Sequence, residues 1–219
     1  MLNENKGFTL AEVLITLLII GVVASLTIPV LINNTNEAEY NVSVKKAYSE
    51  VSNAIKMIQT NNSGAVNVGT AETAVDATPL RNDFCNVMIC NKIGTSVDIF
   101  GPTNYYAYKS SLSTWPMTYA DDAPAAILNN GYLINFYSYT DCNKHNINAC
   151  GAIYVDINGT KGPKMWGKDL YGFWIVKKQP NTDYLILPMG TQGDNLGDCA
   201  VDTWENCTAL RLINPENLP

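Results

Sequence analysis

The sequence predicts an α+β fold, in which one long amino-terminal helix packs on an antiparallel β-sheet. Three observations predict this fold. An apolar run extends from Phe8 to Ile32, a helical stripe of apolar residues continues from Tyr40, and short strand-like segments joined by turn residues begin at Ala125. Helix followed by runs of strand is typical of α+β proteins. The roughly 185 residues after the apolar run have the size of one globular domain.

The apolar run has the length and composition of a membrane-spanning helix. It holds 25 residues, with no Lys or Arg and a single acid, Glu12. At ~1.5 Å per residue such a helix covers about 37 Å, more than a hydrocarbon core of about 30 Å. Pro29 has no N–H for the carbonyl of Ser25, and its ring crowds that carbonyl, so we expect a kink there.

Glu12 is the one acidic residue in this apolar run, and its presence there needs an explanation. A carboxylate at mid-bilayer costs roughly 2.5–3.5 kcal/mol and usually marks a function and a partner. Because Glu12 lies near one end of the run, the alternative is that its side chain reaches the headgroups and has no further role. The neighbouring residues favour the functional interpretation.

The residues around Glu12 form a specific pattern. A polar leader, MLNENKG, ends in Gly7 directly before Phe8, and Glu12 is the fifth residue counted from Phe8. This pattern resembles the prepilin signal of type IV pilins and of type II secretion pseudopilins. The resemblance covers Lys6 to about Ile32, and Pro29 falls where many of these proteins have a helix-kinking Pro.

The resemblance implies a processing and assembly pathway. In that family a membrane peptidase cuts after the Gly and methylates the new amino-terminal Phe, here Gly7 and Phe8, and the residue at the position of Glu12 is needed for assembly. It also implies three parts: a leader (1–7), a transmembrane and assembly helix (8–32), and an exported globular domain (33–219). This domain, with a pilin-like fold, includes the second half of the long helix.

Charge places the globular part outside the cytoplasm. Lys6 precedes the apolar run, whereas Glu37 and Glu39 follow it, which favours an inside amino terminus. The leader lacks a multiply charged start and no small-x-small site follows the run, unlike an ordinary secretory signal. We expect a single-pass protein of the bacterial cytoplasmic membrane, which the resemblance places in a periplasmic or cell-surface filament after assembly.

The second half of the helix is predicted to be amphipathic and to pack on the domain. Its apolar residues are spaced by three and four positions and describe one helical face, which we interpret as core. Asn61, Asn62 and Gly64 are expected to end the helix. The stripe consists of Tyr40, Val44, Ala47, Tyr48, Val51, Ile55 and Ile58.

A loop over 63–78 and a short second helix are expected next. Thr78 and Pro79 predict a cap and first turn, and Gly94 predicts the end of that helix. Its stripe is Leu80, Phe84 and Val87 or Met88. From Ala125 the sequence predicts a meander of strands, with a hairpin turn at Asn129-Asn130-Gly131. The strand segments are AAIL, YLINFYSY, GAIYVDI, DLYGFWIV and DYLILPM.

The six cysteines follow the apolar run, and an even number in an exported domain predicts disulfides. Their spacings of five, eight and eight residues are a poor match to zinc sites, which need close pairs. Cys142–Cys150 and Cys199–Cys207 each close a short loop. Cys85 and Cys90, at i and i+5 of the expected helix, point apart and cannot easily bridge, so their pairing stays open. The looped carboxy-terminal region is similar to the disulfide-bounded region of many type IV pilins.

Catalytic and cofactor-binding patterns are weak in this chain. The single histidine, His145, has no recognisable nucleophile or base around it, and no phosphate-binding, dinucleotide or HExxH motif occurs. Asp156, Asn158 and Asp169 are weak calcium candidates, since calcium takes 6–8 oxygen ligands. The alternative, which we favour, is a turn, because Asn-Gly and Gly-Pro are turn formers. We therefore predict no cofactor and no enzyme.

Partners are predicted by charge and by the resemblance. The net charge of −6 without basic clusters argues against a nucleic-acid partner. The resemblance implies other copies and related subunits, a prepilin peptidase and an inner-membrane assembly machinery. Several aromatics are expected to fill both sides of the sheet, with a ligand-binding face as the alternative. They are Tyr105, Tyr106, Tyr108, Trp115, Tyr119, Tyr132, Phe136, Tyr137 and Tyr139.

The predicted function is that of a filament subunit, either a pilin of a type IV pilus or a pseudopilin of type II secretion. Glu12 is expected to pair with the charged amine of a neighbouring Phe8, which satisfies two charges that lipid does not solvate. Two alternatives stay open at this point. One is a minor tip or adhesion module on the same filament, and the other, less favoured, is a membrane-anchored exported enzyme.

Overall fold

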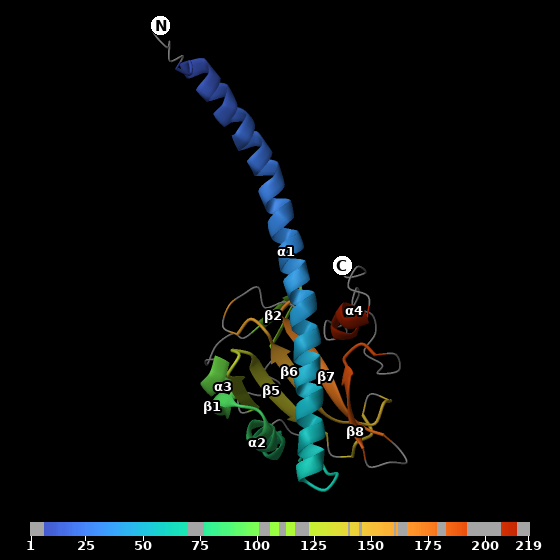
Figure 1. The fold of residues 1–219 in the computed structure, drawn as a ribbon. Coiled ribbons are helices and arrows are strands. Elements are labelled where there is room, and N and C mark those ends of the chain that lie inside the picture. Colours follow the sequence, from blue (N-terminus) through green and yellow to red (C-terminus); the bar gives the residue numbers. More distant parts are fainter. Residues whose placement is uncertain are drawn as a thin grey trace. The chain divides into compact units, whose positions relative to one another are not determined.

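The computed structural model describes residues 7–69, 77–100, 106–109, 113–116, 123–139, 141–144, 146–159, 161, 166–178, 183–191 and 207–213. Its helices and strands are drawn in Figure 1. The helices are α1 (Leu10–Asn61), α2 (Thr78–Val87), α3 (Ser96–Phe100) and α4 (Cys207–Ile213). The strands are β1 (Cys90–Thr95), β2 (Tyr106–Lys109), β3 (Ser113–Pro116), β4 (Pro124–Leu128), β5 (Leu133–Ser138), β6 (Ala149–Asp156), β7 (Leu170–Lys177) and β8 (Tyr184–Pro188).

The chain forms two compact units, Met1–Glu39 and Tyr40–Pro219, and α1 passes through both. The first unit contains the apolar part of α1, and the second contains its amphipathic part with all other elements. The boundary predicted after Ile32 marks the end of the membrane-spanning segment, whereas the boundary after Glu39 separates two compact units. The predicted boundary therefore stays a prediction.

A six-stranded sheet forms the centre of the second unit, with the strand order β1-β4-β5-β6-β7-β8 and antiparallel pairing throughout. The predicted meander is confirmed from β4 to β8. The hairpin turn forms as expected, because the Gly131 N–H donates to the Leu128 carbonyl (2.9 Å) and Gly131 has a φ of +88°. β2 and β3 pair in a separate two-stranded sheet.

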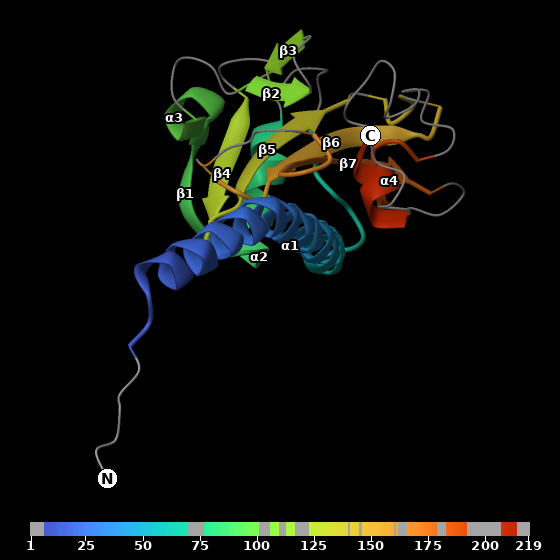
Figure 2. The same cartoon turned by 90° about the horizontal axis from the view of Figure 1, so that it is seen from above.

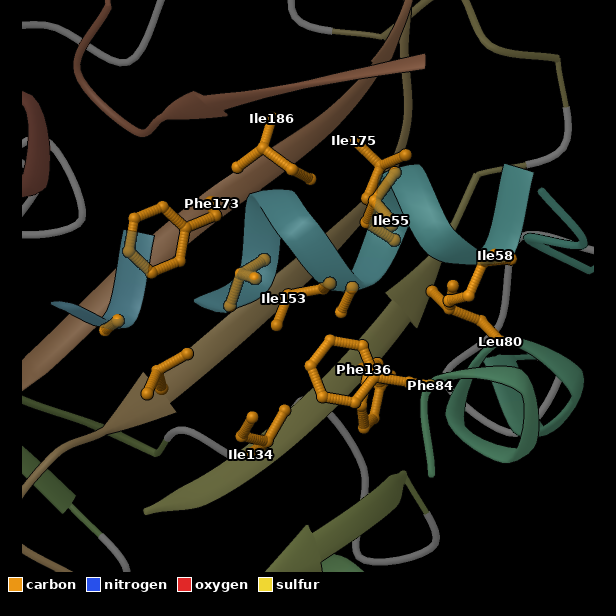
Figure 3. Close-up of a cluster of buried hydrophobic side chains, with 14 of the residues drawn as sticks. Ile55, Ile58, Leu80, Phe84, Ile134, Phe136, Ile153, Phe173, Ile175 and Ile186 are labelled. Carbon is orange, nitrogen blue, oxygen red and sulfur yellow. The ribbon is translucent and has the colours of Figure 1, made fainter. Parts of the chain in front are cut away.

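The predicted core stripe of α1 packs on one face of this sheet. Val44, Ala47, Val51, Ile55 and Ile58 are all buried, and Tyr48 is partly buried against the same cluster. Figure 3 shows Ile55 and Ile58 of α1 facing side chains of the strands and of α2. These partners include Leu80, Phe84, Phe136, Ile153, Phe173, Ile175 and Ile186. Figure 2 shows α1 and α2 on the same side of the sheet. The α+β prediction is therefore confirmed.

The other face of the sheet carries a second buried cluster, which contains Leu133, Tyr154 and Trp174. The aromatics of β5 divide between the faces, since Phe136 belongs to the first cluster and Tyr137 packs against the second. Tyr132 joins the first cluster and Tyr139 packs against the second. The core interpretation is thus confirmed for these four residues. Tyr105 and Tyr119, and the side chains of Tyr106, Tyr108 and Trp115, lie outside the described part.

The prediction for the second helix was right in position and wrong at both ends. Its amino-terminal cap position is Ala77, which provides no side-chain cap, so Thr78 is the first helical residue rather than the cap. The helix ends at Val87 rather than near Gly94, because Met88 adopts an extended backbone (φ −112°, ψ 145°). Gly94 instead lies in β1, an edge strand that the sequence analysis did not predict.

Candidate functional site: the amino-terminal segment

The residues with the predicted processing signal lie at the start of α1. Gly7, Phe8 and Thr9 precede the helix, and α1 begins at Leu10. Phe8 is 89% exposed and Leu10 is 79% exposed. The peptide bond between Gly7 and Phe8 therefore lies outside the hydrogen-bonded helix, in a segment that no other described residue covers.

Thr9 and Glu12 form a reciprocal cap on this helix end. The backbone N–H and the hydroxyl of Thr9 each donate to Oε2 of Glu12, at 2.8 Å in both cases. In return, the backbone N–H of Glu12 donates to Oγ1 of Thr9 at 3.2 Å. This exchange is a capping box, which satisfies two of the free donors of a helix start. The cap also holds the carboxylate at the positive end of the helix dipole.

The sequence analysis did not identify Thr9. The signal was present, because a Thr followed three residues later by Glu, directly before an apolar run, predicts a capping box. The cap changes the interpretation of Glu12, since the carboxylate already has partners within its own chain. A partner on another subunit must therefore replace or share these hydrogen bonds.

The helix behind the cap is apolar and unburied. Leu10–Pro29 has a mean hydropathy of 2.4 and is the one helix among the described residues that is long and apolar enough to cross a membrane. Its polar side chains are satisfied within the helix. The hydroxyls of Thr16, Ser25 and Thr27 donate to carbonyls three or four residues earlier, at 2.9, 2.8 and 3.0 Å. Such a segment needs lipid or other helices around it.

Pro29 lies inside α1, which continues through it to Asn61. The helix is therefore not ended by this Pro, in agreement with the expectation that it resumes. The kink and the roles of Gly7, Phe8 and Glu12 in processing and assembly stay predictions.

The calcium candidates lie at the base of the loop between β6 and β7. Asp156 and Asp169 are buried, and the backbone N–H of Ile157 donates to the Asp169 carbonyl at 2.9 Å. The N–H of Asn158 donates to Oδ1 of Asp156 at 2.8 Å, which is the hydrogen bond of an Asx turn. This supports the turn interpretation. No group of three metal-ligating side chains occurs among the described residues, and calcium binding stays untested.

Two disulfides lie within the described residues. Cys142 is bonded to Cys150, the pair that the sequence predicts. Cys85 is bonded to Cys90, so the expectation that these two cannot easily bridge was wrong. These two cysteines can bridge because α2 ends early, so that only Cys85 lies on the helix and Cys90 begins β1. Cys207 is disulfide-bonded, but Cys199 lies outside the described part, so their pairing stays a prediction.

His145 also lies outside the described residues. The titratable groups of the described part with lowered or raised pKa do not gather in one cavity. Burial raises the pKa of Tyr184, and burial, with the nearby Glu50 charge, raises the pKa of Tyr132. Asp98 has a lowered pKa because the backbone N–H and hydroxyl of Thr95 bind its carboxylate. Each of these shifts has a local structural cause.

Comparison with known proteins gives one match. Residues 2–28 match the family model of the prokaryotic N-terminal methylation motif. No curated protein and no solved structure matches the chain significantly. The matched range contains the exposed Gly7–Phe8 bond, the Thr9–Glu12 cap and most of the apolar helix.

Proposed function

We propose that this chain, a precursor of the type IV pilin or pseudopilin kind, is a structural subunit of a type IV pilus or of a type II secretion filament. The observation that carries the proposal is the exposed apolar helix, most of which lies within the methylation motif. A helix of this composition is covered by lipid in the precursor and by the helices of other subunits in a filament. The role needs neither a cofactor nor a catalytic group of its own.

Processing would take place at the Gly7–Phe8 bond. A prepilin peptidase would hydrolyse it and transfer a methyl group to the new amine of Phe8. The position of this bond before the first helical turn supports the proposal, because a protease needs an extended, accessible substrate segment. The leader 1–7, with Lys6, would remain on the cytoplasmic side, and the second unit would lie outside the cytoplasm.

Assembly would bring the charged amine of Phe8 to the carboxylate of Glu12 on a neighbouring subunit. In the single chain the Thr9 cap satisfies this carboxylate. Inside a bundle of apolar helices, an unpaired ammonium is costly, so a paired carboxylate favours the assembled state. The cap would therefore stabilise the Glu12 carboxylate of the membrane-bound precursor before it pairs with the amine of another subunit.

The proposal is tested by producing the full chain in a bacterial host with and without a prepilin peptidase. With the peptidase, intact-mass analysis should give a chain that begins at Phe8 and carries one extra methyl group. Without it, the chain should begin at Met1. A mature chain that begins beyond Ile32, or one that is unchanged by the peptidase, would contradict the proposed function. A Gly7→Leu variant is the control, and it should remain uncleaved in the membrane.

A further inference from the structure

A groove runs along the second unit between α1 and the edge strand β8. It has a volume of about 430 Å³ and an open side, and it is lined by Tyr48, Ser52, Ile55 and Lys56 of α1 and by Tyr184 and Leu185 of β8, among others. Its floor is apolar, because Ile55 is buried and the Leu185 side chain, 40% exposed, adds to it. No other part of the described chain fills this space.

The groove is not built to accept an added β-strand, although β8 ends the sheet. Backbone carbonyls at the free edge of β8 already have partners from α1. Tyr48 donates its hydroxyl to the Ile186 carbonyl at 3.3 Å, and Gln59 donates Nε2 to the Tyr184 carbonyl at 2.8 Å. An edge covered in this way does not take part in strand addition. The groove is therefore suited to the side chains of a helix.

Polar groups at the groove point to an acidic partner. Lys56 is exposed and makes no ion pair with any described residue. Lys177 of β7 has its Nζ 6.0 Å from the ring centre of Tyr184, which lines the groove. The hydroxyl of Ser52 is buried and has no hydrogen-bond partner among the described residues. A helix that carries a carboxylate beside a small residue would fit this groove. Its carboxylate would face the lysine at the rim, and its small residue would face the apolar floor.

Such a helical segment occurs in this chain, directly after the apolar helix. Glu39 is an exposed residue of α1 that follows the small residue Ala38. The other carboxylates on the described helices already have interaction partners. Asn62 donates to Asp83 at 3.0 Å, and Asn130 donates to Glu50 at 2.9 Å. The Glu39 carboxylate makes no hydrogen bond or ion pair with a described residue, and Glu39 follows the helix that the proposed function places between subunits.

We propose that the α1–β8 groove of one subunit binds the Glu39 turn of α1 from a second copy of this chain, with Lys56 facing Glu39. The inference rests on the proposed filament function and specifies one of its contacts. Both residues lie on α1, 17 positions apart. Groove and acidic turn are different surfaces, and such a heterologous contact repeats without closing.

Charge exchange tests the contact in full-length chains that are the only copy of the subunit in the cell. Lys56→Glu and Glu39→Lys should each lower the sheared filament fraction about fivefold, the scale of one lost ion pair of about 1 kcal/mol. The double variant should restore it, because the pair is re-formed with its signs exchanged. Lys161→Glu, an exposed charge reversal away from the groove, is the control and should assemble normally. Normal assembly of both single variants, or no recovery in the double variant, would overturn the groove contact.

A measurement without substitutions keeps the test decisive if a variant fails to insert or fold. A carbodiimide joins a carboxylate to an amine in direct contact, with loss of water and without a spacer. Treated wild-type filaments should yield a peptide in which Glu39 is joined to Lys56. Filaments that contain other cross-linked pairs and lack this one would contradict the groove contact while leaving the proposed function intact. Wild-type cells that make no filaments under any condition would instead contradict the proposed function.

Discussion

At the scale of single residues, the amino-terminal signal depends on a cap as well as on Gly7, Phe8 and Glu12. Thr9 holds the Glu12 carboxylate at the helix start through two hydrogen bonds and accepts a third from the backbone N–H of Glu12. The sequence contains the Thr-x-x-Glu spacing, so this cap was predictable.

Thr9→Ala should loosen the first turn of α1, because loss of a capping side chain costs about 1 kcal/mol. The amide of Glu12, which donates to Oγ1 of Thr9, should then exchange about fivefold faster with deuterium in detergent micelles. Thr9→Ser, which keeps the hydroxyl, should exchange at the wild-type rate. Equal protection in Thr9→Ala would show that the Glu12 carboxylate does not depend on this cap.

A second cap predicts a pH dependence at the start of α3. Thr95 donates its N–H and hydroxyl to Oδ2 of Asp98, at 2.9 and 2.8 Å, and this lowers the pKa of Asp98. A carboxylate with a lowered folded-state pKa stabilises the fold above its ordinary pKa of about 3.9. That stabilisation is lost as the pH falls through the lower folded-state pKa.

The Thr95 amide proton should therefore keep its NMR shift from pH 7 down to about pH 4 and move only at more acidic pH. Asp98→Asn should abolish this titration, because the amide side chain carries no titratable proton. A midpoint at or above the ordinary pKa would contradict the cap.

At the scale of elements, periodicity predicted the parts whose environment is set by local sequence. The stripe of α1 and the strands from β4 to β8 follow simple periods of apolar residues, and each is found where expected. β1 was not predicted because Cys90–Thr95 is an edge strand with mostly exposed or partly exposed residues and no alternation. The end of α2 was misplaced because Met88 leaves the helix without Gly or Pro to signal it.

Ile55→Ala should destabilise the second unit by about 2–5 kcal/mol, the range for truncating a buried Ile. Ile55 is 1% exposed and belongs to the cluster between α1 and the sheet. Denaturant unfolding of the full chain in micelles measures the change. Asn53→Ala, two residues earlier on the exposed side of the same helix, should change stability by less than about 0.5 kcal/mol. Similar losses for both would contradict the packing of α1 on the sheet.

The six cysteines are predicted to form three disulfides with a defined pairing. Peptide mapping of the unreduced protein should find Cys85 joined to Cys90, Cys142 joined to Cys150, and Cys199 joined to Cys207. The first two pairs follow from the structure, and the third from the loop that these two cysteines close in the sequence. Crossed pairs, or free thiols at Cys142 and Cys150, would contradict this pattern.

At the scale of the whole molecule, the features that carry the two proposals lie in different compact units. The first unit carries the methylation motif and the apolar helix, and the second carries the sheet, the disulfides and the α1–β8 groove. The signal of the first unit was readable because it depends on adjacent residues. The groove was not, because Lys56 and Tyr184 are 128 positions apart and meet only through the pairing of the sheet with α1.

The central claim is that Glu12 acts in assembly, and Glu12→Ala tests it most directly. The variant should insert into the membrane and be cleaved after Gly7, because neither step requires the Glu12 carboxylate to pair with an amine in a bundle of apolar helices. It should be lost from the sheared filament fraction, since each subunit would bury an unpaired amine of Phe8 at a cost of roughly 3–5 kcal/mol. The measurement is the amount of processed subunit in that fraction, from cells that make only the variant. Cleaved Glu12→Ala subunits that are missing from filaments are the predicted result, and wild-type incorporation of this variant would contradict the account.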